Sequence, residues 1–273
     1  MQGIKQFIPT EKKIAYINKL LKVGYYAIDF GSFVNHDIIP QMADTVKVLE
    51  GLDLSNRHSK LISIIANERG AKEACEFEQI DCLGFPFSVS ETFQKRNANS
   101  TISEAVERVK HINDLATKHN KELIIYISMA FGNPYGDAYS PQIVEKWVGE
   151  LAPLNIKTFM LSDTVGVGAP ENISYLFSTL IPAFPDLEIG AHLHTAPHNW
   201  KVKVDAAYKN GCRRFDAAIK GYGGCPMAKD ELIGNMPTEN LLNYFSTEDL
   251  DNHFSLDAFE EALRESNQVF PLH

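Results

Sequence analysis

Seven short apolar segments alternate with helical segments along this chain, and that alternation limits the folds it can adopt. Several of the segments are almost continuously hydrophobic, which is typical of strands buried on both faces of a sheet. Regular strand–helix alternation predicts a parallel sheet covered by helices. The expected strands occupy residues 25–33, 60–67, 80–88, 122–130, 157–166, 187–195 and 213–221.

The expected helices have recognisable ends. Thr10 is expected to cap the first helix and Gly24 to end it, while Thr101 and Glu104 have the spacing of a capping box. Proline stands at the start of two other helical patterns. The remaining patterns cover 68–78, 141–154, 170–181 and 198–211, and two more helices are expected after residue 236, starting near Thr238 and Ser255.

This order of elements fits an α/β TIM (β/α)8 barrel. A closed barrel needs eight strands, whereas the pattern shows seven and begins with a helix, so either the sheet is open or a strand belongs before residue 1. No GxGxxG fingerprint or P-loop is present, which argues against a nucleotide-binding Rossmann fold. We expect one catalytic domain over residues 1–273, with a helical extension from about residue 236.

Composition excludes several classes of function. The net charge of −9 argues against a general nucleic-acid surface, which needs basic charge to displace counterions. No apolar run is long enough to span a membrane, and no signal peptide is visible. The four cysteines form no CxxC pair and are few for 273 residues, which favours a reducing compartment and a cytoplasmic location.

The segment "GAHLHTAP" carries the clearest candidate site. His192 and His194 are two residues apart on an expected strand, so their side chains project to the same face. Two adjacent imidazoles are natural metal ligands, and catalytic groups of a barrel lie at the carboxyl ends of its strands. The alternative is that one or both histidines are hydrogen-bonded core residues.

Other candidates follow other strands. A glycine-rich loop after the last strand carries Cys225, and Asn235 ends this segment. The loop is either a mobile lid that brings the thiol to the substrate or an ordinary closing loop. Asp163 ends one strand and is either a catalytic or a turn residue. Asp29 lies in an otherwise apolar strand, where an unpaired carboxylate would be costly, so it needs a partner.

A basic segment follows the strand at 80–88. Lys95 and Arg96, with Asn97 beside them, are placed to meet phosphate groups, and a solvated basic loop is the alternative interpretation.

Several motifs, taken together and in order, resemble the 3-hydroxy-3-methylglutaryl-CoA (HMG-CoA) lyase family of metal-dependent TIM barrels. The resemblance covers residues 1 to about 235, and the GGCP loop is its most specific part. The motifs are "IDFGSFV" with "PQMAD" (28–44), "SETFQKRN" (90–97), "LSDTVGVGAP" (161–170), "AHLHT" (191–195) and "GGCP" with "GN" (224–235).

The resemblance implies cleavage of HMG-CoA to acetyl-CoA and acetoacetate, a reaction of leucine degradation, in an enzyme that forms a homodimer. His192, His194 and Asn235 match family ligands of a divalent cation, Mg²⁺ or Mn²⁺. Cys225 matches the loop acid/base, and Asp29 and Asp163 match acids that support the metal and substrate. The acyl-CoA substrate is the expected partner.

The start of the chain departs from the family pattern. The family's first strand ends in an Arg-Asp pair, and here Met1 and Gln2 match the residues just after it, which places Gln2 near the substrate. The Asp would be an anionic metal ligand and the Arg would steady the enolate, so we expect the chain as written to lack its first strand.

Three functional alternatives remain open at this point. The lead interpretation is an HMG-CoA lyase-like carbon–carbon lyase. A related Claisen-type acyltransferase (isopropylmalate or citramalate synthase-like) or a 2-oxo-acid aldolase would share the histidine pair. A non-catalytic paralogue with an incomplete site would show no lyase activity.

Overall fold

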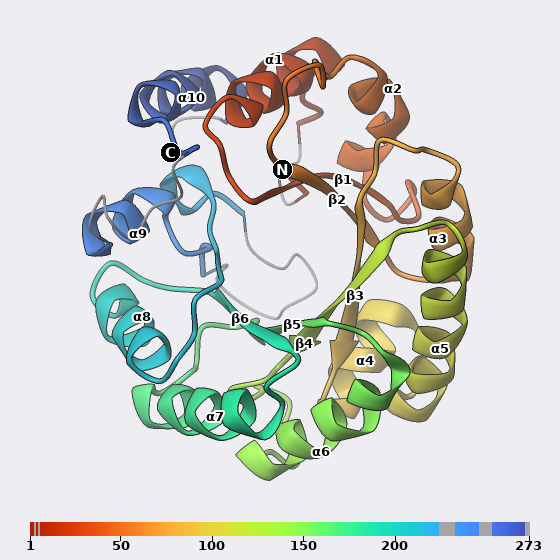
Figure 1. The fold of residues 1–273 in the computed structure, drawn as a ribbon, viewed down its shortest axis with the longest axis vertical. Coiled ribbons are helices and arrows are strands. Elements are labelled where there is room, and N and C mark those ends of the chain that lie inside the picture. The colour runs from red at the N-terminus through yellow and green to blue at the C-terminus, as the bar shows by residue number, and fades with distance from the viewer. Residues whose placement is uncertain (3, 5, 224–232, 246–252, 271–273) are drawn as a thin grey trace.

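The seven expected strands form a single all-parallel sheet that curls into a barrel (Figure 1). The computed structural model describes residues 1–2, 4, 6–223, 233–245 and 253–270. The strands follow one another around the ring in chain order: β1 (Ala27–Phe33), β2 (Lys60–Ile65), β3 (Cys82–Ser88), β4 (Glu122–Ser128), β5 (Thr158–Asp163), β6 (Glu188–Leu193) and β7 (Phe215–Asp216).

The sheet has two edges, β1 and β7. Each strand pairs with the next one in the chain, and in the described part of the chain no ladder joins β7 to β1. The last strand is short, and its ladder on β6 consists of the pairs Ala191–Phe215 and His192–Asp216. The predicted α/β barrel with seven visible strands is therefore confirmed.

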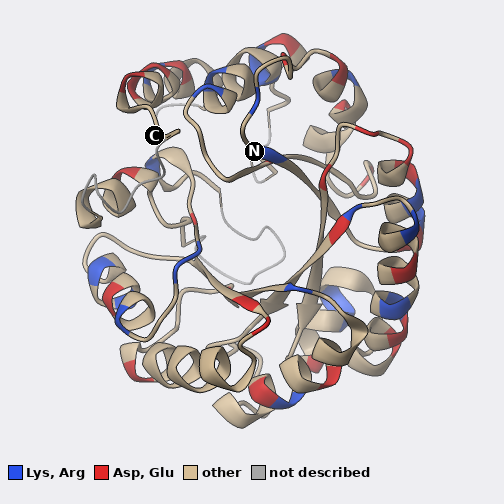
Figure 2. Ribbon diagram, viewed as in Figure 1, with Lys and Arg blue, Asp and Glu red and all other residues tan. Residues whose placement is uncertain are grey.

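Helices surround the sheet on its outer side (Figure 1). Most charged residues lie on these helices or at strand ends around the ring (Figure 2). The helices are α1 (Thr10–Leu21), α2 (Thr45–Glu50), α3 (Glu68–Cys75), α4 (Glu91–Ala98), α5 (Ile102–Lys118), α6 (Pro141–Leu151), α7 (Pro170–Ala183), α8 (Trp200–Lys209), α9 (Thr238–Tyr244) and α10 (Leu256–Val269), with 3₁₀ turns at Pro40–Met42, Ala152–Leu154 and Ile219–Gly221.

Local sequence signals place most helix ends correctly, with one clear error. Thr101 and Glu104 form the predicted capping box, and Ser255 caps α10 through the backbone nitrogen of Ala258. Thr10, however, is the first helical residue and not the cap. Pro9 occupies the cap position, and the Thr10 hydroxyl instead donates to Asp44 Oδ2 (2.8 Å).

The segment after β3 differs from the expectation of a loop. Residues 91–98 form α4, whose N-cap is Ser90: the Ser90 hydroxyl accepts a hydrogen bond from the backbone nitrogen of Phe93 (3.1 Å). Buried Phe93 and Gln94 hold one side of this helix against β3, so tertiary packing outweighs its low overall hydrophobicity.

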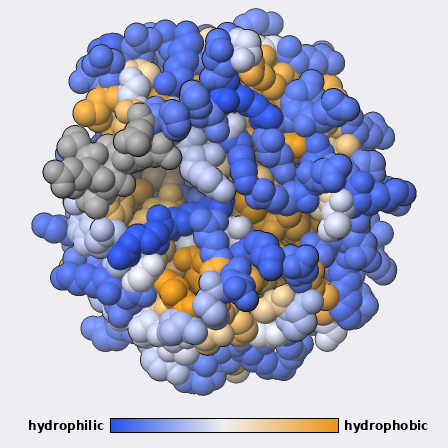
Figure 3. All heavy atoms as spheres, in the orientation of Figure 1, coloured by the Kyte–Doolittle hydropathy of each residue, from blue (hydrophilic) through white to orange (hydrophobic). Residues whose placement is uncertain are grey.

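The main core lies between the strands and the outer helices, and a smaller apolar cluster fills the barrel interior. The interior cluster comprises Ile62, Cys82, Ile124 and Met160, one from each of four strands. On one face of the molecule, polar residues predominate and apolar residues reach the surface in patches (Figure 3).

A third apolar cluster joins the two ends of the sheet. Helix α10 packs on α1, where the rings of Tyr16 and Phe270 meet edge to face at 5.6 Å, and it also packs on Ile219 beyond β7. The C-terminal helices therefore cover the seam between β1 and β7 from outside. Among the described helices, none is both long and apolar enough to cross a lipid bilayer.

Candidate active site

The two candidate histidines lie together at the carboxyl end of β6. Their ring centroids are 5.5 Å apart, as expected for residues that alternate along a strand and share one face. Asn235 reaches the same place from a distant part of the chain, because its backbone forms an antiparallel bridge with His194. The structure thus brings together His192, His194 and Asn235, the three residues matched to metal ligands.

Asp216 accepts a hydrogen bond from His192. The Nδ1 atom of His192 lies 3.0 Å from Asp216 Oδ2, on the adjacent strand β7. A carboxylate oxygen can only accept, so Nδ1 carries the proton and Nε2 keeps its lone pair. The ring of Tyr126 packs edge to face on this imidazole at 5.6 Å, and the Tyr126 hydroxyl also bonds to Asp216.

His194 is buried and neutral. Burial lowers the pKa of His194 to about 3, and the nearby positive charges of His192, when protonated, and Lys203 act in the same direction. The backbone carbonyl of Ile233 bonds to the ring. A neutral imidazole is the form that binds a metal ion.

Acidification is expected to destabilise the fold through His194. Its folded-state pKa is about 3 and its ordinary value is 6.5, so between these values the unfolded chain binds a proton that the folded chain does not. The free energy of unfolding must therefore fall as the pH falls through this window. Urea unfolding at about pH 7.5 and about pH 5 should show a smaller decrease for His194→Gln than for wild type. Equal decreases in both proteins would contradict this assignment.

Asp163 lies behind the histidines, in a buried ion pair. Lys203 Nζ is 2.6 Å from Asp163 Oδ2, and it also donates to the carbonyl oxygens of Gly166 (2.8 Å) and His194 (3.1 Å). The backbone nitrogen of Gly168 donates to the other carboxylate oxygen (2.9 Å). Burial raises the pKa of Asp163, and the Lys203 ammonium opposes that shift. Lys203 therefore links the Asp163 carboxylate to the backbone carbonyl of His194.

Asp29 faces the interior from β1. Its side chain is exposed by surface area although protein atoms surround it, and its carboxylate interacts electrostatically with the amino group of Met1, with Asp216 and with His192. Poor hydration in this enclosed position raises the pKa of Asp29 to about 7, and the nearby Asp216 carboxylate adds to the shift. The sequence analysis expected a partner for the Asp29 carboxylate, and the charged groups of the candidate site fill that place.

The glycines before the candidate loop allow a close approach to Asn235. A Cβ atom at Gly223 would lie 2.5 Å from Asn235 Nδ2, and the φ angle of Gly223 is +110°. The Asn235 amide nitrogen donates to the carbonyl oxygen of Tyr222 (2.9 Å), so the amide oxygen is the atom of this side chain that could serve as a metal ligand. Cys225 lies outside the described residues, so its predicted role stays a prediction.

The basic residues of α4 sit on the rim, apart from the histidines. The guanidinium of Arg96 stacks over the ring of Tyr135 at 4.7 Å, and Lys95 pairs with Glu91 at 3.5 Å. Both cations are exposed and Asn97 is half-buried. Gln2 lies in a turn closed by the hydrogen bond from the backbone nitrogen of Ile4 to the carbonyl oxygen of Met1, and the N-terminus of the chain is near β1 (Figure 1).

The donor atoms of the site fit part of a divalent-cation shell. His192 presents Nε2, His194 is neutral, and Asn235 offers an amide oxygen. Within the described ranges, no group of three His, Cys, Asp or Glu side chains lies close enough to hold a metal ion. The protein donors are therefore two nitrogens and one neutral oxygen, and further oxygen ligands would have to complete the shell.

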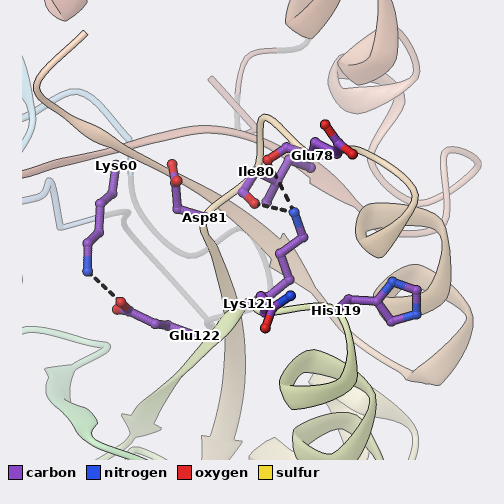
Figure 4. A pocket seen from close by; sticks show the side chains of 8 residues that line it. Lys60, Glu78, Ile80, Asp81, His119, Lys121 and Glu122 are labelled. Atoms are coloured by element: carbon purple, nitrogen blue, oxygen red, sulfur yellow. Dashed lines mark hydrogen bonds and ion pairs between the residues drawn. The ribbon is translucent and has the colours of Figure 1, made fainter.

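A pocket of about 380 Å³ lies at the opposite end of the barrel (Figure 4). Its cations are already paired: Lys60 Nζ is 2.5 Å from Glu122 Oε1, and Lys121 Nζ donates to the carbonyl oxygens of Phe77 and Ile80. In barrels this amino-terminal face serves stability, and catalysis takes place at the other face. The pocket is therefore not a candidate active site.

Three residues of the site were not predicted from the sequence. Asp216 lies inside the run expected as a strand at 213–221, as Asp29 lies inside the run at 25–33, so the same reasoning that selected Asp29 applies to it. Lys203 lies on the buried face of α8, where the helical pattern otherwise places apolar residues, so a lysine at this position is a detectable signal. Tyr126 gives no signal, because a tyrosine in a strand is ordinary.

Comparison with known proteins agrees with the motifs. The HMGL-like family model matches residues 1–265. The hydroxymethylglutaryl-CoA lyase YngG of Bacillus subtilis is 30% identical over 242 residues, which cover 89% of this chain and 80% of that protein. The cytoplasmic 3-hydroxy-3-methylglutaryl-CoA lyase of Rattus norvegicus is 30% identical over 242 residues, 89% of this chain and 70% of that protein.

A solved structure extends the agreement to three dimensions. The HMG-CoA lyase of Acinetobacter baumannii, in complex with coenzyme A and 3-methylmalate, superimposes with a TM-score of 0.89 at 29% identity. The match covers 98% of this chain and 87% of that one. The resemblance drawn from the sequence motifs is confirmed.

Proposed function

This chain belongs to the HMGL-like family, and we propose that it is a metal-dependent carbon–carbon lyase that cleaves HMG-CoA into acetyl-CoA and acetoacetate. The observation that carries the proposal is the pair of histidines at the carboxyl end of β6, with ring centroids 5.5 Å apart and one imidazole tied to Asp216. This pair lies where barrel enzymes place their chemistry. We place the reaction in leucine degradation, as the family resemblance implies.

His192, His194 and Asn235 would hold the cation, Mg²⁺ or Mn²⁺. When bound, such a cation lowers the pKa of a coordinated hydroxyl and polarises a coordinated carbonyl oxygen. The imidazoles suit Mn²⁺ better than Mg²⁺, which prefers oxygen ligands. The substrate's own oxygens are the natural source of the remaining ligands.

The acidic residues and the cysteine have different roles in the proposed reaction. Asp29 faces the interior with a pKa of about 7, which suits proton transfer at neutral pH. Asp163 supports His194 through Lys203 and does not reach the substrate itself. Cys225 is assigned as the acid/base that delivers a proton to the nascent acetyl carbon, as its family match implies.

The acyl-CoA carrier binds at the rim. Arg96 and Lys95 present exposed positive charge on α4, and such side chains pair with phosphate oxygens. Asn97 and Gln2 complete the proposed substrate contacts. We further propose that the enzyme forms a homodimer, as the family resemblance implies, and that it acts in the cytoplasm, as its few cysteines indicate.

Replacing Cys225 by serine is expected to reduce kcat by at least about 10²-fold, because loss of a positioned acid/base typically costs that much. Cys75→Ser, a change on the outer helix α3, is the matched control and should leave kcat within a few-fold of wild type. The measurement is acetoacetate release from HMG-CoA at saturating substrate. Equal rates for Cys225→Ser and wild type would remove Cys225 from the mechanism and favour an acyltransferase.

Chelation and substrate exchange test the proposed reaction. Treatment of the full chain with EDTA should abolish acetyl-CoA release from HMG-CoA, and excess Mn²⁺ or Mg²⁺ should restore it. In parallel, acetyl-CoA with pyruvate or 2-oxoisovalerate should release no free CoA. Release of CoA from those pairs, without cleavage of HMG-CoA, would instead identify a Claisen-type acyltransferase.

A further inference from the structure

We propose that Asp216 is a positioning residue that fixes the tautomer and orientation of His192, so that Nε2 of this imidazole is presented to a divalent cation. The inference rests on the proposed metal dependence of the site. Asp216 itself touches neither cation nor substrate in this account, and it acts only through His192.

Strand register fixes the contact between the two side chains. His192 and Asp216 are direct partners in the short parallel ladder between β6 and β7. Paired residues on adjacent strands project to the same face of the sheet and are close enough to interact, and here Nδ1 and Oδ2 are 3.0 Å apart. Both side chains are partly buried, with exposed fractions of 31% for His192 and 26% for Asp216. Limited solvent access strengthens the bond between them.

Two further groups hold the carboxylate in place. Tyr126 bonds to Asp216 through its hydroxyl and packs its ring against His192, so it contacts both members of the pair. The side chain of Arg214, two residues before Asp216, interacts electrostatically with this carboxylate and pairs with Glu188. Asp216 is therefore anchored, and its anchoring orients the imidazole.

Among the residues that the structure describes, no carboxylate bonds to His194, so the two imidazoles have unequal partners. Its ring bonds to the backbone carbonyl of Ile233, and its backbone carbonyl accepts from Lys203. A carboxylate partner raises the basicity of a ligating imidazole more than a neutral carbonyl does. Within the described part of the chain, His192 thus has the partner that makes it the stronger donor.

Nuclear magnetic resonance of the metal-free full chain tests the tautomer directly. With ring nitrogens labelled and His192 assigned by comparison with His192→Gln, we expect a protonated Nδ1 and an unprotonated Nε2. A protonated Nε2 at neutral pH would overturn the proposal without any variant at Asp216. The measurement uses neither metal nor substrate, so it stands apart from the proposed lyase activity.

Variants at Asp216 then test the consequence for metal binding. In Asp216→Asn the amide can donate to Nδ1 and favour the opposite tautomer, so Mn²⁺ affinity should fall by about 10- to 100-fold. Asp205→Asn is the matched control, since Asp205 on α8 also accepts from a tyrosine, Tyr244 (2.7 Å), but lies outside the site. Tyr126→Phe removes one anchor of the carboxylate and should have a smaller effect in the same direction.

Two measurements distinguish the positioning role of Asp216 from a general loss of stability in the variant. Mn²⁺ titration followed by electron paramagnetic resonance gives the affinity, and urea unfolding gives stability. Mn²⁺ affinity in folded Asp216→Asn within about 2-fold of wild type would refute the proposal. Altered tautomer and affinity in a chain that does not cleave HMG-CoA would support it while refuting the proposed function.

Discussion

Replacing His192 by alanine is expected to lower kcat/KM for HMG-CoA cleavage by about 10³-fold or more, since a bound metal supplies several kcal/mol of transition-state stabilisation. His192 offers Nε2 to the cation and is held by Asp216 at 3.0 Å. Its side chain is partly exposed, so truncation removes a ligand without opening a large cavity in the core. The loss should therefore appear in catalysis and metal affinity, and not in folding.

His198→Ala is the matched control for that experiment. His198 lies six residues further along the chain, on the exposed loop before α8, and has no part in the proposed site. Its kcat/KM should stay within about 2-fold of wild type. Steady-state kinetics with added Mn²⁺ makes the comparison. Retention of more than about a tenth of wild-type kcat/KM by His192→Ala would contradict its role as a ligand.

Replacing Lys203 by methionine is expected to lower the free energy of unfolding by about 3–5 kcal/mol, because it leaves the Asp163 carboxylate buried and unpaired. The Lys203 ammonium is 2.6 Å from Asp163, and both side chains are almost fully buried. Lys203 also bonds to the carbonyl oxygens of Gly166 and His194. Three hydrogen-bond partners thus lose their donor at once.

Urea unfolding measures this effect, and two further variants interpret it. Lys209→Met breaks the exposed Lys209–Asp205 pair, also at 2.6 Å, and should cost less than about 1 kcal/mol. Lys203→Met with Asp163→Leu removes both buried charges and should recover much of the stability. A cost for Lys203→Met no larger than for Lys209→Met would show that the buried pair contributes little.

The seven strands were predictable because their sequences are apolar on both faces, which few other structures permit. Their lengths were less predictable. The run at 213–221 suggested a long strand, yet in the described structure the pairing with β6 stops at Asp216, and the chain turns into the 3₁₀ segment Ile219–Gly221 soon after. The helix at 91–98 was not predicted, because it depends on the packing of Phe93 against β3, a tertiary contact that the local sequence does not reveal.

The candidate site was predictable where it depends on local geometry. Alternation along one strand puts His192 and His194 on one face, whatever the rest of the fold. Their partners depend on register between strands distant in sequence: Asp216 meets His192 across β6 and β7, and Lys203 reaches Asp163 from α8. No sequence spacing encodes these contacts, so they emerge only from the folded structure.

The most direct test of the central claim is product analysis with the full chain. HMG-CoA labelled with carbon-13 is incubated with the protein and Mn²⁺, and both products are quantified by mass spectrometry. We predict acetyl-CoA and acetoacetate in equal amounts, with formation of both abolished by EDTA and strongly reduced by His192→Ala. Unchanged HMG-CoA, or its hydrolysis to free CoA and 3-hydroxy-3-methylglutarate, would contradict the account.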